Sequence, residues 1–329
     1  MKTYQQLWQS LTPLYDAGEA QAIVRTVLDV EYGMTLTDII GGKVNELSAD
    51  EGRKLEEIII RLQKGEPVQY VLGEADFAGR TFHVEPGVLI PRPETAELCQ
   101  WIEEDFAGKS TDSPEDSSED SSVDSPQATD DARQILDICT GSGCIAITLG
   151  LNIPNSEVTG WDISEDALRI AQGNVEMMKA GNVRIEHQDA LALPKAAETD
   201  NEKMKGNDDK EVVKPKGEAK TPSTQKWDLI VSNPPYICEK EKADMEKNVL
   251  EHEPSLALFV PDEDPLKFYR AIAEYASSAL KPGGALYFEI NPIYEKETRK
   301  MLEELGFKDI ETKEDAFGKK RMMRAKSTK

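Results

Sequence analysis

The chain has 329 residues, 39% of them hydrophobic, which is enough for one large globular domain and a smaller one. Its formal net charge of −23 argues against a protein that binds chiefly to phosphate backbones, because such binding depends on Lys and Arg. No stretch reaches the ~20 apolar residues of a membrane span. The first residues also lack the apolar core of a signal peptide, so we expect a cytoplasmic protein.

The first 70 residues carry apolar side chains at three- and four-residue spacing, which predicts a small helical domain. Its last helix opens at Ser48 with Glu51 three residues later, the signature of a capping box, and Gly65 follows its end. In residues 71–92, short β-branched and aromatic runs between glycines predict a β-hairpin linker.

Residues 93–329 alternate between apolar strands and amphipathic helices, apart from two polar stretches. These stretches, at about 107–132 and 195–226, lack any apolar period, and we expect them to be disordered insertions. The predicted strands are 134–139, 157–163, 183–189, 227–233, 284–290, 309–315 and 321–326. The predicted helices are 144–151, 164–181, 264–280 and 295–305.

This alternation predicts an α/β fold with a doubly wound, mostly parallel, seven-stranded Rossmann-like sheet. In such sheets ligands bind beyond the carboxyl ends of the strands. The cysteines do not indicate a metal there, because none has the paired CxxC spacing of a zinc site. We expect reduced thiols and no metal at the four positions Cys99, Cys139, Cys144 and Cys238.

The first strand of this sheet runs into a glycine-rich turn that opens onto a helix, at Asp137, Thr140, Gly141, Ser142 and Gly143. Glycine lets the backbone approach a ligand closely, and the start of the next helix offers free N–H groups. The turn has neither a complete GxGxxG nor the GK[ST] of a nucleoside triphosphate site, so by itself it indicates only a turn.

The next two strands end in acidic residues. Asp162 lies about twenty residues after the glycine turn, where a carboxylate can accept hydrogen bonds from a ribose diol. Alternatively Asp162 caps the following helix, a role that Ser164 can fill equally. Asp189 and Ala190 follow the third strand, where an adenine can lie. The three strand ends together predict an adenosine-containing cofactor.

The fourth strand stops at Asn233, Pro234, Pro235 and Tyr236. Because proline cannot donate to a ladder, pairing ends here, and we expect the Asn233 side chain and the Pro234 carbonyl to face the cleft as two acceptors. A planar NH₂ group, on an amide or a base, can donate both hydrogens to them, with Tyr236 against its plane. Such a clamp would orient a weakly nucleophilic nitrogen toward an electrophilic methyl group. Taken by itself, the motif is also explained as a strand-ending turn.

With these motifs assembled, the chain resembles the peptide chain release factor N5-glutamine methyltransferases, the PrmC/HemK family of class I S-adenosylmethionine-dependent methyltransferases. The resemblance covers most of the chain apart from the two insertions. It rests on four segments, GEPVQYVLGEADFAGRTFHVEPGVLIPRPET, LDICTGSGCIAI, VSNPPYI and EHEPSLALF.

The resemblance implies an enzyme that methylates the glutamine side-chain amide in the Gly-Gly-Gln tip of class I release factors. It implies that residues 1–70 help to dock the release factor and that residues 93–329 form the methyltransferase domain. By position, the cofactor would contact Cys139, Thr140, Gly141, Ser142, Gly143, Asp162, Asp189, Ala190 and Asn233. The glutamine would be held by Asn233, Pro234, Pro235 and Tyr236, with Arg92 and Glu94 lining the cleft; the catalytic set would be Asn233, Pro234 and Tyr236.

The sequence departs from the family pattern at two places. Cys139 replaces the usual first glycine of the cofactor turn, so we expect its backbone to have an ordinary φ. The segment INPIYEKE after the fifth strand replaces the family's GYQ-like segment.

Two other functions are compatible with these motifs. An adenine-N6 nucleic-acid methyltransferase acts on the same planar NH₂ group, although the acidic charge and the lack of a basic or aromatic-rich recognition segment argue against it. A non-catalytic adaptor, with the acidic tract as an interaction tail, is opposed by the intact clamp and glycine turn. We expect class I release factors as partners, with no membrane and no direct nucleic-acid binding.

Overall fold

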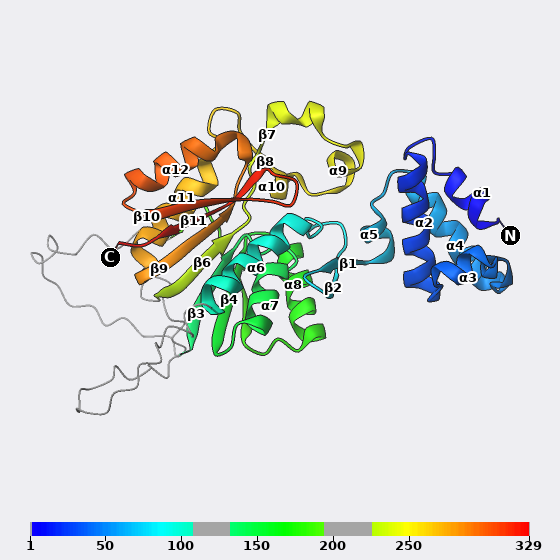
Figure 1. The fold of residues 1–329 in the computed structure, drawn as a ribbon, viewed down its shortest axis with the longest axis horizontal. Coiled ribbons are helices and arrows are strands. Elements are labelled where there is room, and N and C mark those ends of the chain that lie inside the picture. Colours follow the sequence, from blue (N-terminus) through cyan, green and yellow to red (C-terminus); the bar gives the residue numbers. More distant parts are fainter. Residues whose placement is uncertain (1, 108–131, 194–225, 329) are drawn as a thin grey trace, which may run out of the picture.

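A computed structural model describes residues 2–107, 132–193 and 226–328, which form a small helical lobe and a larger α/β lobe joined by a β-hairpin (Figure 1). The two polar stretches predicted as insertions, about 107–132 and 195–226, lie outside these residues except at their ends. Within the described ranges, no helix is long and apolar enough to cross a membrane.

The helical lobe packs its helices around one apolar core that includes Leu11, Val24 and Leu62. Its first four α-helices are α1 (Tyr4–Gln9), α2 (Ala17–Tyr32), α3 (Leu36–Ile40) and α4 (Ala49–Leu62). The capping box predicted for α4 is confirmed, since Ser48 Oγ accepts from the Glu51 N–H at 3.3 Å while Glu51 accepts from the Ser48 N–H at 2.7 Å.

A helical turn, α5 (Val68–Leu72), crosses the predicted boundary between the helical domain and the linker, so residues 71–72 are helical where extended runs were predicted. Packing overrides β-propensity here, because one helical turn places Val71 in the core of the small lobe and Tyr70 in a cluster with the hairpin. The predicted hairpin follows as β1 (Glu74–Phe77) and β2 (Arg80–His83).

The larger lobe is built on a seven-stranded sheet in the order β10-β11-β9-β6-β3-β4-β5. Five strands are parallel, while β11 pairs antiparallel with β9 and β10 antiparallel with β11, so the predicted fold class is confirmed. The strands are β3 (Arg133–Ile138), β4 (Ser156–Asp162), β5 (Val183–His187), β6 (Trp227–Ser232), β9 (Leu280–Glu289), β10 (Lys308–Glu314) and β11 (Lys320–Lys326). Strand order reverses at β3, so a crevice is expected where the chain leaves β3, β4 and β6.

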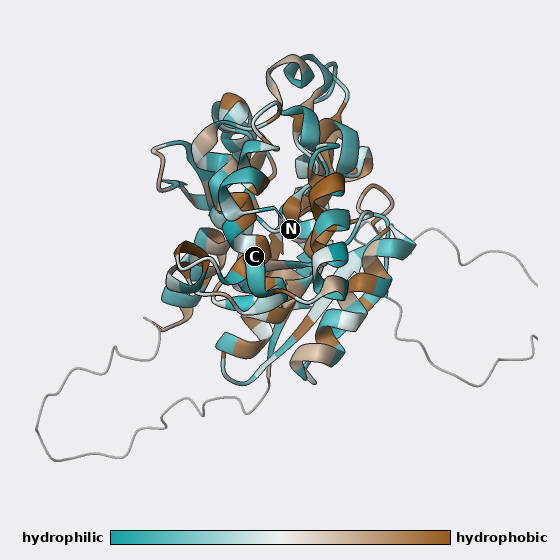
Figure 2. Ribbon diagram, turned by 90° about the vertical axis from the view of Figure 1, so that its right-hand side faces the viewer, coloured by the Kyte–Doolittle hydropathy of each residue, from teal (hydrophilic) through white to brown (hydrophobic). Residues whose placement is uncertain are grey.

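Helices cover both faces of the sheet (Figure 1). One face carries α6 (Pro93–Ala107), α7 (Cys144–Asn152) and α8 (Glu165–Met178), and the other carries α11 (Lys267–Ala279) and α12 (Glu295–Glu304). Most helices mix apolar and hydrophilic residues, as expected of helices with one buried face (Figure 2).

The chain between β6 and α11 contains five short elements that the sequence pattern did not predict. They are β7 (Ile237–Cys238), the 3-10 helix η4 (Glu239–Asp244), α9 (Lys247–His252), α10 (Ser255–Leu258) and β8 (Phe259–Val260). Elements of two to six residues are too short to show a period. This segment matters because it covers one side of the cavity described next.

Candidate active site

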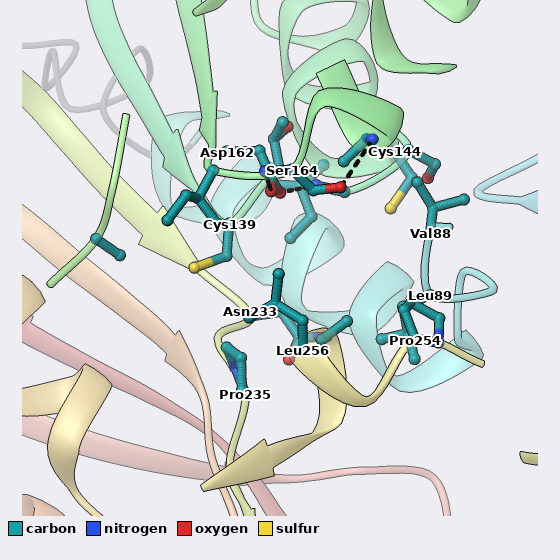
Figure 3. Close-up of a pocket in the computed structure, with 18 of the residues that line it drawn as sticks. Val88, Leu89, Cys139, Cys144, Asp162, Ser164, Asn233, Pro235, Pro254 and Leu256 are labelled. Carbon is teal, nitrogen blue, oxygen red and sulfur yellow. Dashed lines mark hydrogen bonds between the residues drawn. The ribbon is translucent and has the colours of Figure 1, made fainter. Parts of the chain in front are cut away.

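A cavity lies at the carboxyl ends of β3, β4 and β6, where the strand order reverses (Figure 3). The turn after β3 and the ends of β4 and β6 contribute its polar side, and the hairpin side contributes Val88 and Leu89. Leu256 of α10 adds a further apolar side chain. The cavity therefore combines polar strand ends with apolar walls, the usual character of a small-molecule site.

Ten of the residues singled out from the sequence line this cavity. They are Arg92, Cys139, Thr140, Gly141, Ser142, Asp162, Asp189, Ala190, Asn233 and Pro235. The other four, Glu94, Gly143, Pro234 and Tyr236, do not line it.

Each of these four has a different position. Gly143 has a φ of +80°, and a Cβ there would lie 3.2 Å from Ala171 of α8, so it permits close helix packing. Pro234 is buried, and Glu94 lies in the first turn of α6. Tyr236 directs its hydroxyl to the buried Glu289, at 3.0 Å, and not into the cavity.

The backbone at Cys139 contradicts our expectation of an ordinary φ. Its φ is +63°, in the left-handed region that favours glycine. The next residue explains why the turn needs this conformation: the Thr140 N–H donates to the Trp161 carbonyl of β4 at 2.9 Å, which ties the turn to the neighbouring strand. Burial raises the pKa of the Cys139 thiol well above its ordinary value, so the thiol is neutral.

Asp162 connects the ends of two strands. One carboxylate oxygen accepts from the Gly141 N–H and the other from the Ser164 N–H, both at 2.9 Å. Burial raises the pKa of Asp162, and these two bonds oppose that shift. Ser164 is the residue that caps α8, by accepting from the Ala167 N–H at 3.3 Å. A carboxylate oxygen has a second lone pair, so Asp162 retains acceptor capacity toward the cavity.

Asp137, which was expected in the glycine turn but was not assigned to the cofactor, is a buried acid near the end of β3. Its Oδ2 accepts from the Thr140 hydroxyl at 2.6 Å and from the Ala146 N–H at 3.2 Å, while Oδ1 has no partner among the described residues. Burial raises its pKa to about 7. In the sequence, the feature that could have indicated its importance is its position as an acid in an otherwise apolar strand.

The side-chain amide of Asn233 is held by a hydrogen-bonded chain that starts at Thr95, which also lines the cavity. Its Nδ2 donates to Thr95 Oγ1 at 3.1 Å, and the Thr95 hydroxyl donates to Glu289 Oε2 at 2.6 Å. The Tyr236 hydroxyl donates to the other oxygen of Glu289. In the described part of the chain, no hydrogen bond is made to Asn233 Oδ1. The sequence analysis did not identify Thr95 and Glu289 as part of this group.

Arg92 makes an ion pair with Glu253, whose side chain is 1% exposed. The second oxygen of Glu253 accepts from the Ile90 N–H at 3.2 Å. Glu253 therefore fastens the hairpin side of the cavity to the segment that carries Leu256. In the sequence, Glu253 could have been found only as an acid within EHEPSLALF, a segment that was identified by its resemblance to the family.

The lining residues fit an adenosine-type cofactor. The carboxylates of Asp162 and Asp189 supply acceptors for hydroxyl groups, and the apolar walls supply a surface for a base. Across the ranges that the structure describes, no group of three or more His, Cys, Asp or Glu side chains is arranged to hold a metal ion.

Comparison with known proteins extends over both lobes. The family model described as a methyltransferase domain matches residues 129–317, and that described as the PrmC N-terminal domain matches residues 12–73. A Bacteroides thetaiotaomicron protein named release factor glutamine methyltransferase is 43% identical over 96% of this chain and 96% of its own length. Relatives with the same name are 35% identical in Flavobacterium psychrophilum, over 98% of both chains, and 34% identical in Streptococcus pneumoniae, over 88% and 86%.

Proposed function

The chain belongs to the release factor glutamine methyltransferase family, and we propose that it transfers a methyl group to the side-chain amide of the glutamine in the Gly-Gly-Gln tip of class I release factors. The observation that carries this proposal is that Asn233, the polar end of the amide clamp, lines the same cavity as Gly141 and Asp162. Acceptor and donor of the methyl group would thus meet in one enclosed space.

In this proposal the cofactor is S-adenosylmethionine, which supplies the methyl group and leaves as S-adenosylhomocysteine. Asp162 accepts from the ribose hydroxyls, and Asp189 with Ala190 borders the adenine. Cys139, Thr140, Gly141 and Ser142 form the turn that borders the rest of the cofactor, and Gly143 acts by allowing α7 to approach α8.

The same proposal assigns the glutamine amide to Asn233 and Pro235. Asn233 Oδ1 accepts one amide hydrogen, which orients the nitrogen and favours the charge that develops on it. Tyr236 acts through Glu289, and Arg92 acts through Glu253 to hold the cavity wall. The Pro234 carbonyl remains the proposed second acceptor, and Glu94 would act from outside the cavity.

We further propose that residues 1–70 dock the release factor, that 71–92 link the two lobes, and that 93–329 form the catalytic domain. The expected compartment is the cytoplasm, where release factors act.

The proposal is tested by transfer of labelled methyl from S-adenosylmethionine to three acceptors: purified class I release factor, the same factor with its tip glutamine changed to alanine, and nucleic acid containing adenine. Label on the intact factor alone supports the proposal. Label on nucleic acid without label on the factor would instead assign adenine as the acceptor, and failure to bind S-adenosylmethionine would favour an adaptor.

A further inference from the structure

The orientation of the Asn233 amide decides whether the amide clamp can work. Its Oδ1 can accept a hydrogen from a substrate NH₂ group, whereas its Nδ2 would meet that group donor to donor. An asparagine amide can be turned by 180° with little change in shape, so its hydrogen-bond partners must select one orientation.

The hydrogen-bond partner of the Asn233 amide is the Thr95 hydroxyl, whose only hydrogen is already donated to Glu289. Thr95 Oγ1 donates to Glu289 at 2.6 Å, so toward Asn233 it can only accept, and the amide must present Nδ2 to it at 3.1 Å. Oδ1 is then the amide atom directed away from Thr95, and among the described residues it accepts no hydrogen bond, so it is free for a ligand in the cavity that Asn233 and Thr95 both line. Figure 3 shows Asn233 at this cavity.

Glu289 makes this arrangement directional. It is 2% exposed at the end of β9, and its two oxygens accept from Thr95 and from Tyr236. Burial raises the pKa of Glu289, whereas the hydrogen bonds from Thr95 and Tyr236 and the charge of Arg321 oppose that shift. The ionised carboxylate accepts from both donors and so holds the Thr95 hydroxyl as a donor toward itself. One acid on β9 therefore controls both ends of the clamp segment, Asn233 through Thr95 and Tyr236 directly.

We propose that Thr95 and Glu289 are positioning residues that fix the Asn233 amide with its oxygen toward the substrate nitrogen. The inference deepens the proposed function and rests on it. Thr95 also lines the cavity, but its hydroxyl is engaged by Glu289 and Asn233, so in this proposal both residues act through Asn233 and Tyr236.

The test compares Thr95→Val, which keeps the shape but removes the hydroxyl, with Thr95→Ser, which keeps the hydroxyl. Loss of one buried hydrogen-bonded link predicts that Thr95→Val lowers kcat for methyl transfer about 5- to 150-fold. We expect Thr95→Ser to stay within about threefold of wild type, with KM for the release factor and Kd for S-adenosylmethionine unchanged in both variants.

Thr298→Val is the matched control. Thr298 lies in α12 and is fully buried, and among the described residues its Oγ1 has no hydrogen-bond partner. Thr298→Val is therefore the same chemical change as Thr95→Val at a similarly buried position, but without a hydrogen bond to Asn233. We expect the kcat of Thr298→Val to equal that of the wild type.

A second measurement separates a changed orientation of the Asn233 amide from a general loss of structure in the active site. In the wild type, Oδ1 repels a carboxylate, so a release factor with glutamate at its tip should inhibit no better than one with alanine. In Thr95→Val the Asn233 amide is free to turn and can present Nδ2 to a carboxylate. The release factor with glutamate at its tip should then inhibit more strongly than the factor with alanine, a difference that a merely structural defect would not produce.

The outcomes distinguish the two proposals. An active wild type whose kcat is matched by Thr95→Val overturns the positioning role and leaves the proposed function intact. A Thr95→Ser variant as slow as Thr95→Val also overturns the positioning role. A wild type that transfers no methyl to the factor overturns both.

Discussion

The carboxylate of Asp162 accepts a hydrogen bond from the backbone N–H of Gly141 at 2.9 Å, and so joins the ends of β4 and β3 at the cavity. The bond spans 21 residues of sequence. It means that the proposed ribose-binding acid also sets the shape of the glycine turn, so the two features are not independent.

We therefore predict that Asp162→Ala raises the Kd for S-adenosylmethionine more than tenfold, since it removes a ligand acceptor and releases the turn. Isothermal titration calorimetry measures the effect directly. Asp50→Ala, which removes the same charge from the exposed start of α4, should leave the Kd unchanged. Equal affinities in the wild type and Asp162→Ala would contradict the assignment.

Gly143 offers a prediction about stability. In Gly143→Ala the new Cβ would lie 3.1 Å from Ile147 and 3.2 Å from Ala171, at a φ of +80°. Strain and crowding together should lower the free energy of unfolding by about 1–3 kcal/mol. Gly173→Ala in α8 is the control, because nothing lies within 4 Å of its added Cβ; it should raise stability by roughly 0.5–1 kcal/mol. Denaturant titration tests both, and equal effects would refute the packing role.

The sheet and its helices were predictable because long apolar periods determine them. The strand ends were predictable as well, since Asp162 and Asn233 directly follow apolar runs. What the sequence did not reveal depends on contacts between distant segments. Thr95 and Glu289 are 194 residues apart, and neither has a local pattern that indicates their bond.

The error at Cys139 has a similar origin. Cysteine gives no local reason for a positive φ, and only the bond from the Thr140 N–H to the Trp161 carbonyl on β4 shows why the turn adopts it. Likewise, Tyr236 was expected in the cleft because its neighbours face it, but Glu289 provides a buried acceptor for its hydroxyl.

The ion pair of Arg92 and Glu253 can be separated from a direct role of Arg92 in substrate binding. Arg92→Ala leaves a buried carboxylate unpaired and should lower the free energy of unfolding by about 3–5 kcal/mol. Adding Glu253→Gln removes that charge and should restore much of both stability and activity. A KM for the release factor that stays raised in the double variant would show instead that Arg92 contacts the substrate.

Asp137 should make stability depend on pH. Its pKa is raised to about 7 in the folded protein by burial, so the folded state holds a proton that the unfolded state releases near pH 4. This group's contribution to stability is thus fully present below pH 4 and is lost as the pH rises through 7. In Asp137→Asn the amide oxygen can keep the bonds from Thr140 and Ala146 without charge.

We therefore expect the stability of Asp137→Asn relative to wild type to increase by about 2 kcal/mol between pH 5.5 and pH 8. Denaturant unfolding at the two pH values measures this change, and the comparison with wild type cancels the titration of all other groups. A difference that stays constant with pH would show that Asp137 is ionised throughout this range.

Asn233→Ala tests the clamp itself. Because the residue is proposed to orient the substrate amide, its loss should reduce kcat for methyl transfer by two or more orders of magnitude, while the Kd for S-adenosylmethionine stays within about threefold. Asn45→Ala, on the exposed surface of the small lobe, should match wild type in both measurements. Single-turnover kinetics and calorimetry separate the two quantities. Since Asn233 lines the cofactor cavity, an equal loss of cofactor affinity would show that it acts through the cofactor and not on the glutamine.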